Sequence, residues 1–296
     1  MEDFAARGKD VVCPAPDAEP GPPSRYAMPA GAVDAHAHVI GPPPYNPERG
    51  YTPSVHPVDE YLGVLDACGL ASGVLVQPTV HGDDNRVMLA ALRAHPARLR
   101  GVAVLAPTAS DRDIATLKDA GTVGLRLVAA ASGGQGLADL DRYEALCRDA
   151  GWHLQFMVNG DRLGAVAARL RALRVPVVID HLGYFPADLG PESTAVHDIL
   201  SLLDAGAWIK LSGAFRVASR ADLADTVPIA RAFIAAAPDR CVWGSDWPHV
   251  NFRKPMPRMG ELLDLLAQWA PDAAQRRRIL VDNPRRLYRF DEVFHA

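Results

Sequence analysis

Two histidines stand one residue apart in the stretch GAVDAHAHVIG, residues 31–41, and this spacing suits three kinds of chemistry. His36 and His38 could clamp a metal ion, donate hydrogen bonds in a reaction without metal, or serve only in packing. Side chains two residues apart in a strand point to the same face, so we expect Asp34, His36 and His38 to be co-facial. The spacing by itself favours a metal clamp.

Polar side chains also end most of the other apolar runs of the chain. Each one left unpaired in an apolar interior would cost a few kcal/mol, so a shared site explains them economically. A single histidine at a strand end is more often structural, but several that converge with a carboxylate favour a functional site. The polar residues are Gln77, Thr79 and His81, Arg126, Gln155, Asp180 and His181, Lys210, Ser212 and Arg216, and Ser245, Asp246, His249 and Asn251.

Eight short apolar runs, each followed by an amphipathic stretch, must position these residues. The alternation predicts βα units and a single (β/α)8 TIM barrel, in which chemistry gathers at the carboxyl ends of the strands. An open doubly wound sheet is the alternative, but no G-x-G-x-x-G motif opens the first helix. The predicted strands cover residues 32–39, 72–78, 101–106, 123–128, 153–158, 176–182, 207–213 and 240–246.

The composition limits the class of protein. The 296 residues are 49% hydrophobic, enough to bury a large core, and the net charge of −4 argues against a nucleic-acid partner. Four scattered cysteines, no apolar run of membrane-spanning length and no export signal predict a cytoplasmic protein without membrane contact. Residues 1–30 are rich in proline and predict an extension, either laid over the barrel of residues 31–296, disordered, or reaching a neighbouring subunit of a homo-oligomer.

The motifs VDAHAHV, VIDHLG and WGSDWPH, in this order, resemble those of the amidohydrolase superfamily, amidohydrolase family 2. The wider set YTP, VQPTVHGDDN, GLRL, DHLG, KLSGAFR and GSDWPHVN is similar to the branch that contains 2-pyrone-4,6-dicarboxylate lactonase. The likeness covers residues 31–296. It implies a barrel and a hydrolase that acts on a carboxylic ester, here a lactonase of aromatic compound catabolism.

The resemblance also raises the question of a metal. Most members of the superfamily bind zinc or a similar ion through the HxH pair, groups on strands four to six and the aspartate of strand eight. Arg126 and Gln155 stand near two of those positions here, and neither is a good zinc ligand. The set of His36, His38, His181 and Asp246 could still hold one zinc or manganese ion. Because the lactonase branch works without metal, we expect no cofactor.

Hydrolysis of a lactone needs an activated water and donors aimed at the carbonyl oxygen. Asp246 is the expected base, because a carboxylate accepts hydrogen bonds and can take a proton from water. We expect His36, His38 and His181 to polarise the carbonyl in place of a metal.

Two arginines predict a small anionic substrate. Arg126 and Arg216 each match a carboxylate with a guanidinium fork, although an arginine in a loop is commonly solvated. The resemblance adds Tyr51 and Thr79 as substrate contacts, for which packing and helix capping are the plain alternatives, and His249 is expected to line the site. The branch carries a second arginine after the first, whereas VAAASGG follows here, which departs from the pattern for the pyrone dicarboxylate.

Other functions remain open at the level of sequence. Within the superfamily they are a metal-dependent hydrolase or decarboxylase and a sugar-acid lactone hydrolase or isomerase. A barrel without catalytic activity, used for binding or assembly, is a different class. The presence of Asp246 together with three histidines argues against this last reading.

Overall fold

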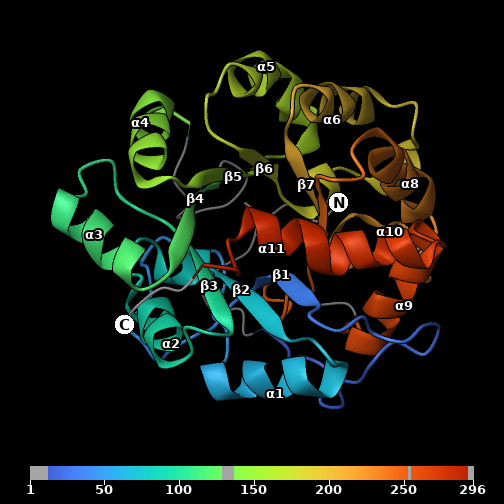
Figure 1. The fold of residues 1–296 in the computed structure, drawn as a ribbon, viewed down its shortest axis with the longest axis horizontal. Coiled ribbons are helices and arrows are strands. Elements are labelled where there is room, and N and C mark those ends of the chain that lie inside the picture. Colours follow the sequence, from blue (N-terminus) through green and yellow to red (C-terminus); the bar gives the residue numbers. More distant parts are fainter. Residues whose placement is uncertain (1–12, 129–136, 253–254, 293–296) are drawn as a thin grey trace.

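The computed structural model describes residues 13–128, 137–252 and 255–292, and its centre is a barrel of eight parallel strands (Figure 1). The strands form one sheet in chain order, and each of the eight predicted runs overlaps one strand, although β3 and β4 begin before the predicted residues 101 and 123. The (β/α)8 prediction is confirmed, and the doubly wound alternative, which needs a reversal of strand order, is wrong. The strands are β1 (Val33–Ala37), β2 (Ser72–Val76), β3 (Leu99–Ala103), β4 (Thr122–Val128), β5 (His153–Met157), β6 (Val177–Ile179), β7 (Trp208–Leu211) and β8 (Cys241–Trp243).

Most of the helices form an outer ring around the strands, because they bury an apolar stripe against the barrel. None of the helices in the described ranges is both long and apolar enough to cross a membrane. The helices are α1 (Val58–Cys68), α2 (Arg86–Ala94), α3 (Asp111–Asp119), α4 (Leu140–Ala150), α5 (Gly160–Arg171), α6 (Thr194–Asp204), α7 (Ala214–Val217), α8 (Thr226–Ala236), α9 (Met259–Trp269), α10 (Ala273–Arg277) and α11 (Asn283–Leu287).

The barrel is closed at one end and polar at the other. α11 crosses the barrel in Figure 1, and Leu287 and Tyr288 pack with inward-facing residues such as Val33 and Val242 near the amino ends of the strands. Between β8 and β1 the sheet closes where the His38 amide donates to the Trp247 carbonyl at 2.8 Å. This arrangement leaves the carboxyl ends of the strands as the open face for chemistry.

A bulge in β1 corrects one expectation from the sequence. The pairing of β1 with β2 shifts between Asp34 and Ala37, which interrupts the alternation of side chains. Asp34 therefore lies outside the barrel, where it accepts hydrogen bonds from Tyr61 of α1 at 3.0 Å and from the Ser245 hydroxyl at 2.5 Å. The prediction that Asp34 shares a face with His36 is wrong, and Asp34 ties β1 to α1 and to the end of β8.

The described part of the extension, residues 13–30, lies on the protein's own barrel. The Met259 amide, at the start of α9, donates to Asp17 at 3.2 Å, and the amides of Ser24 and Arg25 both donate to Asp264 at 2.8 Å. Farther along, the Cys13 amide donates to the carbonyl of Thr52 at 3.0 Å. The segment thus follows α9 and reaches the loop after β1.

Candidate active site

One buried carboxylate, that of Asp246 after β8, lies at the centre of a group of histidines at the open end of the barrel. Its Oδ1 is 3.4 Å from Nε2 of His38, 3.7 Å from Nε2 of His36 and 3.9 Å from Nε2 of His181. Its Oδ2 accepts a short hydrogen bond of 2.5 Å from Nε of Arg216. The structure therefore brings together four residues predicted as catalytic and one predicted to bind substrate.

Strained backbone and close approach hold these side chains in place. His181 has a φ of 52° and Asp246 a φ of 63°, in the left-handed region that residues other than glycine rarely adopt. A Cβ on Gly213 would lie 2.9 Å from Nδ1 of His181, and one on Gly244 would lie 2.7 Å from Cβ of His36. The glycines that follow β7 and β8 are therefore needed to let the two histidine rings reach the centre.

The Nδ1 atoms of His38 and His181, which point away from Asp246, each have a hydrogen-bond partner. Nδ1 of His38 lies 2.7 Å from the carbonyl of Val76, which can only accept, so this nitrogen carries a proton. A neutral His38 then presents a lone pair on Nε2 toward Asp246. Nδ1 of His181 lies 3.0 Å from the hydroxyl of Ser212, which can donate or accept.

A second buried carboxylate, Asp180 at the end of β6, lies beneath this group. Its Oδ2 accepts hydrogen bonds from Nε of Arg126 at 3.1 Å and from the amide of Gln155 at 3.0 Å. Its Oδ1 lies 3.3 Å from Nδ1 of His36 and 3.6 Å from Nζ of Lys210. Asp180 thus pairs with the two buried cations Arg126 and Lys210, and it contacts His36, one of the histidines around Asp246.

The two carboxylates stay ionised for the same reason. Burial alone would raise the pKa of Asp246, but the guanidinium of Arg216 outweighs this effect and holds the pKa well below its ordinary value. At Asp180, burial is likewise outweighed by the positive charges of Lys210 and Arg126, and the pKa is held well below the usual range. Both groups are therefore anions at neutral pH.

For the buried basic groups a lowered pKa favours the neutral form. Burial, followed by the charge of Lys210, lowers the pKa of His36 well below its usual value, and burial lowers that of His181 to about 4. Both rings are therefore neutral at pH 7. Burial also lowers the pKa of Lys210 to about 8, although Asp180 opposes this shift, so Lys210 is mostly an ammonium ion at neutral pH.

A small cavity of about 30 Å³ opens beside Asp246, with room for water but for no lactone. Most of the predicted substrate contacts face it, including Tyr51 and Thr79. His249 is fully buried and packs edge-on against Phe215 at 5.1 Å; it is absent from the described residues that line the cavity. The lining consists of His38, Tyr51, Pro78, Thr79, Arg126, Met157, His181, Arg216, Asp246 and Val250.

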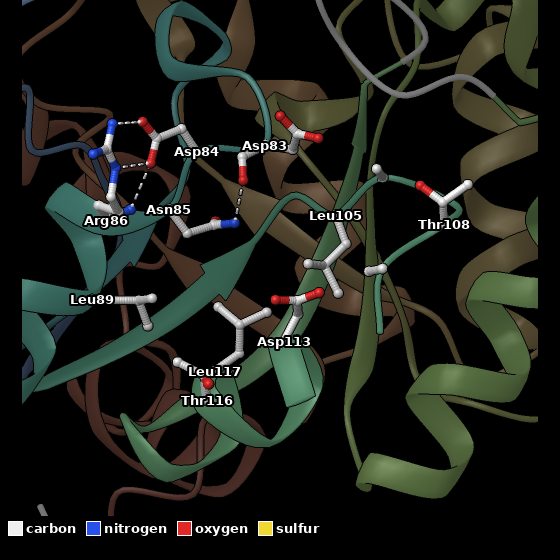
Figure 2. Close-up of a pocket in the computed structure, with 12 residues that line it drawn as sticks. Asp83, Asp84, Asn85, Arg86, Leu89, Leu105, Thr108, Asp113, Thr116 and Leu117 are labelled. Carbon is white, nitrogen blue, oxygen red and sulfur yellow. Dashed lines mark hydrogen bonds and ion pairs between the residues drawn. The ribbon is translucent and has the colours of Figure 1, made fainter. Parts of the chain in front are cut away.

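A larger hollow of about 410 Å³ lies between the segments that follow β2 and β3 (Figure 2). Arg86 pairs there with Asp84 at 2.6 Å, and both are accessible to solvent. The amide of Asn85 donates to the carbonyls of Asp83 at 2.9 Å and Val104 at 2.7 Å. Because its polar groups are paired or exposed, this hollow is a weaker candidate for chemistry than the cavity at Asp246.

The residues around Asp246 offer enough ligand atoms to hold a metal ion. One ligand atom from each of His36, His181 and Asp246 falls within 4.8 Å of the others. The charge around them does not fit, because Arg216 already occupies Oδ2 of Asp246 and Lys210 lies 3.3 Å from Nδ1 of His36. A divalent ion would add two positive charges to a site whose buried cations already outnumber its carboxylates.

Three residues at the site received no function from the sequence. Asp180, Lys210 and Ser212 were recognised only as polar side chains at strand ends. The signal for Lys210 is its place inside the apolar run AWIKLSG, since an ammonium in a buried strand requires a partner. The substitution VAAASGG for the second arginine of the lactonase branch lies mainly in residues 129–136, outside the described residues.

Comparisons with known proteins show the family of this chain. The sequence profile of the family described as amidohydrolase matches residues 33–290. The chain is 37% identical over 278 residues to a 4-sulfomuconolactone hydrolase of Hydrogenophaga intermedia, which covers 90% of this chain and 91% of that protein.

Two further relatives are a protein and a solved structure. A 2-pyrone-4,6-dicarboxylate hydrolase of Comamonas testosteroni is 35% identical over 296 residues, which covers 93% of this chain and 95% of that one. The crystal structure of a probable 2-pyrone-4,6-dicarboxylic acid hydrolase from Acinetobacter baumannii, with citric acid bound, has a TM-score of 0.77 and 28% identity and covers 87% of this chain and 99% of that chain.

Proposed function

The chain belongs to the amidohydrolase family, and on this basis we propose that it hydrolyses a carboxylated lactone without a metal ion. The observation that carries the proposal is the ionised Asp246, which three histidines surround beside a cavity with two arginines in its lining. A carboxylate base, hydrogen-bond donors and anion-binding groups are the parts that hydrolysis of an anionic lactone needs.

The names of the relatives support an anionic substrate. One describes a lactone with a sulfonate group and another a lactone with two carboxylates. Arg126 and Arg216 both line the cavity, and a guanidinium binds such groups with two parallel hydrogen bonds. We therefore propose a substrate with one or two acidic groups on or near the lactone ring, such as 2-pyrone-4,6-dicarboxylate.

In the proposed reaction Asp246 and His38 orient the attacking water. Oδ1 of Asp246 and Nε2 of His38 are 3.4 Å apart, and we propose that His38 carries its single proton on Nδ1, so that one water can donate a hydrogen bond to each of these two atoms and keep a lone pair for the carbonyl carbon. The water oxygen bonds to that carbon, Asp246 takes its proton, the ring C–O bond breaks, and the leaving oxygen receives the proton. This assigns acceptance to His38, in place of the donation expected from the sequence.

Arg216 links binding to the strength of the base. With Arg216 on Oδ2, Asp246 has a low pKa and is a weak base. The cavity is smaller than a lactone, so a substrate must displace side chains when it enters. We propose that an acidic group of the substrate draws Arg216 away from Asp246, which makes room and raises the basicity of the carboxylate.

Turnover with and without chelator tests the reaction and the absence of a metal together. We expect the purified protein, dialysed against chelator, to open 2-pyrone-4,6-dicarboxylate or 4-sulfomuconolactone at an undiminished rate. Loss of ring absorbance gives the rate, and mass spectrometry of the product shows the gain of one water. If the protein contained stoichiometric zinc or manganese and lost its activity when chelator removed that metal, the proposal of metal independence would be contradicted. An isomeric lactone as the product would contradict hydrolysis. Failure on both substrates from neutral to alkaline pH would contradict this substrate class.

Replacing Arg216 with methionine is expected to shift the acid limb of the pH profile upward. Asp246 must be deprotonated to act, so activity falls as the pH drops through its pKa. In the wild type Arg216 holds this pKa well below 3.8, whereas in Arg216→Met burial remains and raises it. We expect kcat/KM of the variant to decline in acid at a higher pH than in the wild type, with a raised KM. The exposed Arg231→Met serves as control, and an unchanged acid limb would refute the role of Arg216.

A further inference from the structure

The side chain of Lys210 lies fully buried in the barrel beneath His36, and the reaction proposed above gives it no part. We propose that Lys210 is a positioning residue that keeps the single proton of His36 on Nε2, so that His36 donates a hydrogen bond toward the substrate and cannot act as a metal ligand. The proposal rests on the metal-independent function proposed above. It turns on which nitrogen of one ring carries hydrogen.

The contacts of Lys210 limit what its neighbour can be. Nζ lies 3.3 Å from Nδ1 of His36, 3.6 Å from Oδ1 of Asp180 and 5.7 Å from the centre of the Tyr288 ring. An ammonium group has three donors and no acceptor. A hydrogen bond from Lys210 to His36 therefore requires a lone pair on Nδ1.

Asp180 offers the competing arrangement. Its Oδ2 is occupied by Arg126 and Gln155, and its Oδ1 lies 3.3 Å from Nδ1 of His36. A proton on Nδ1 could point to this oxygen, but it would then lie against the ammonium of Lys210. With the proton on Nε2, the lone pair of Nδ1 faces Lys210, and Asp180 keeps its attraction to both cations. In this second arrangement the lone pair of Nδ1 also lies 3.3 Å from Oδ1 of Asp180, but the positive charge of Lys210 lies near both atoms and offsets their repulsion. The charge of Lys210 therefore favours the second arrangement.

The consequence for His36 concerns the side that faces the substrate. A neutral imidazole has one N–H group, so a bare Nδ1 places that group on Nε2, which lies 3.7 Å from Asp246 and has no hydrogen-bond partner among the residues the structure describes. A histidine that binds a metal through Nε2 has the opposite arrangement, with Nδ1–H donating to a carboxylate, a backbone carbonyl or water. Asp180 stands where such a carboxylate would stand, and Lys210 reverses its effect.

His38 provides an internal comparison. Its Nδ1–H donates to the carbonyl of Val76 at 2.7 Å, so its Nε2 accepts when the ring is neutral. The neighbouring rings of His36 and His38, with centroids 5.0 Å apart, would then carry opposite tautomers. A donor for the carbonyl oxygen and an acceptor for the water would thus lie side by side, which attack on a carbonyl requires.

The tautomer can be measured directly by ¹⁵N NMR on histidine-labelled protein, with the His36 signals assigned from a His36→Asn variant. We expect the wild type to show N–H on Nε2 and Lys210→Met to show it on Nδ1. The methionine is unbranched and only one atom shorter than the lysine, and Arg126 still balances Asp180 in the variant. A wild-type ring with its proton on Nδ1 would overturn the proposal. This measurement needs no substrate, so it stands or falls separately from the proposed reaction.

Zinc affinity and a double-mutant cycle test the consequences. We expect Lys210→Met to bind Zn²⁺, added alone in titration calorimetry, about 10-fold or more tightly than the wild type, in line with the usual effect of such outer contacts. Unchanged affinity would contradict the proposal.

For turnover, we expect kcat to fall about 10²-fold in Lys210→Met but less than about 3-fold when Lys210→Met is added to His36→Asn. Tyr288→Phe, which changes the barrel floor beside Lys210 without removing a charge, is the control and should retain activity. Equal losses of activity in both backgrounds would indicate a general structural role and refute the positioning role.

Discussion

Asp246→Asn is expected to lower kcat by about 10³- to 10⁴-fold, the upper part of the range that a general base contributes. The substitution removes the group that takes the proton of water, and the amide also places a donor where the water must donate. The carboxylate is almost fully buried, at 1% exposure, and contacts all three histidines, so no other described carboxylate reaches the same point.

The measurement is single-turnover and steady-state hydrolysis of the lactone that the wild type opens most rapidly. Asp84→Asn is the matched control, because this carboxylate also pairs with an arginine but lies in the larger hollow of Figure 2. We expect the control to stay within about 2-fold of the wild type, and thermal unfolding must show that both variants fold. A variant without Asp246 that retained its rate would rule out this base.

The order of the strands and helices was predictable because each βα unit has its own recognisable sequence pattern. Short apolar runs that alternate with amphipathic stretches predicted all eight strands, from β1 at residues 33–37 to β8 at residues 241–243. The rule that strands of such barrels end at the catalytic face then placed His181 and Asp246 together without any knowledge of distances. Local pattern and fold agree here, so the sequence was sufficient.

The bulge in β1 marks the limit of that reasoning. Strict alternation placed Asp34 on the face of His36, but one irregular step in pairing with β2 sends Asp34 outward to Tyr61. The bulge depends on how β1 docks between β2 and the end of β8, which is a property of the assembled barrel. The spacing of residues in VDAHAHV therefore does not predict the bulge.

The partners of the charged residues were also beyond the sequence. Arg126 was predicted to bind a substrate carboxylate, but in the structure its Nε donates to Asp180, and Arg216 likewise holds Asp246. Such pairs depend on strand register and on side-chain direction across the barrel, and a list of polar strand ends contains neither. These pairings give the buried arginines partners within the protein itself.

Asp180→Asn is expected to lower the free energy of unfolding by about 3 to 5 kcal/mol, the cost of removing one partner from a buried ion pair. The side chain is 1% exposed, and its loss leaves Arg126 and Lys210 buried with only an amide between them. This is a large part of the roughly 5 to 15 kcal/mol that stabilises a typical domain. Urea unfolding followed by circular dichroism measures the change, and Asp204→Asn, on the exposed end of α6, should stay within about 0.5 kcal/mol of the wild type.

Two further measurements identify the charge of Asp180 as the cause. Its folded pKa is depressed, so its contribution is present above the unfolded value of about 3.9 and is lost as the pH falls toward the folded value. The gap between wild type and Asp180→Asn should therefore shrink in acid. Adding Lys210→Met removes one of the stranded cations and should restore at least about 1 kcal/mol. Buried unpaired charge predicts both a pH-dependent difference in the free energy of unfolding and a rescue when Lys210 is removed. If the difference stayed constant with pH and the double variant were less stable than Asp180→Asn, lost packing would be the cause instead.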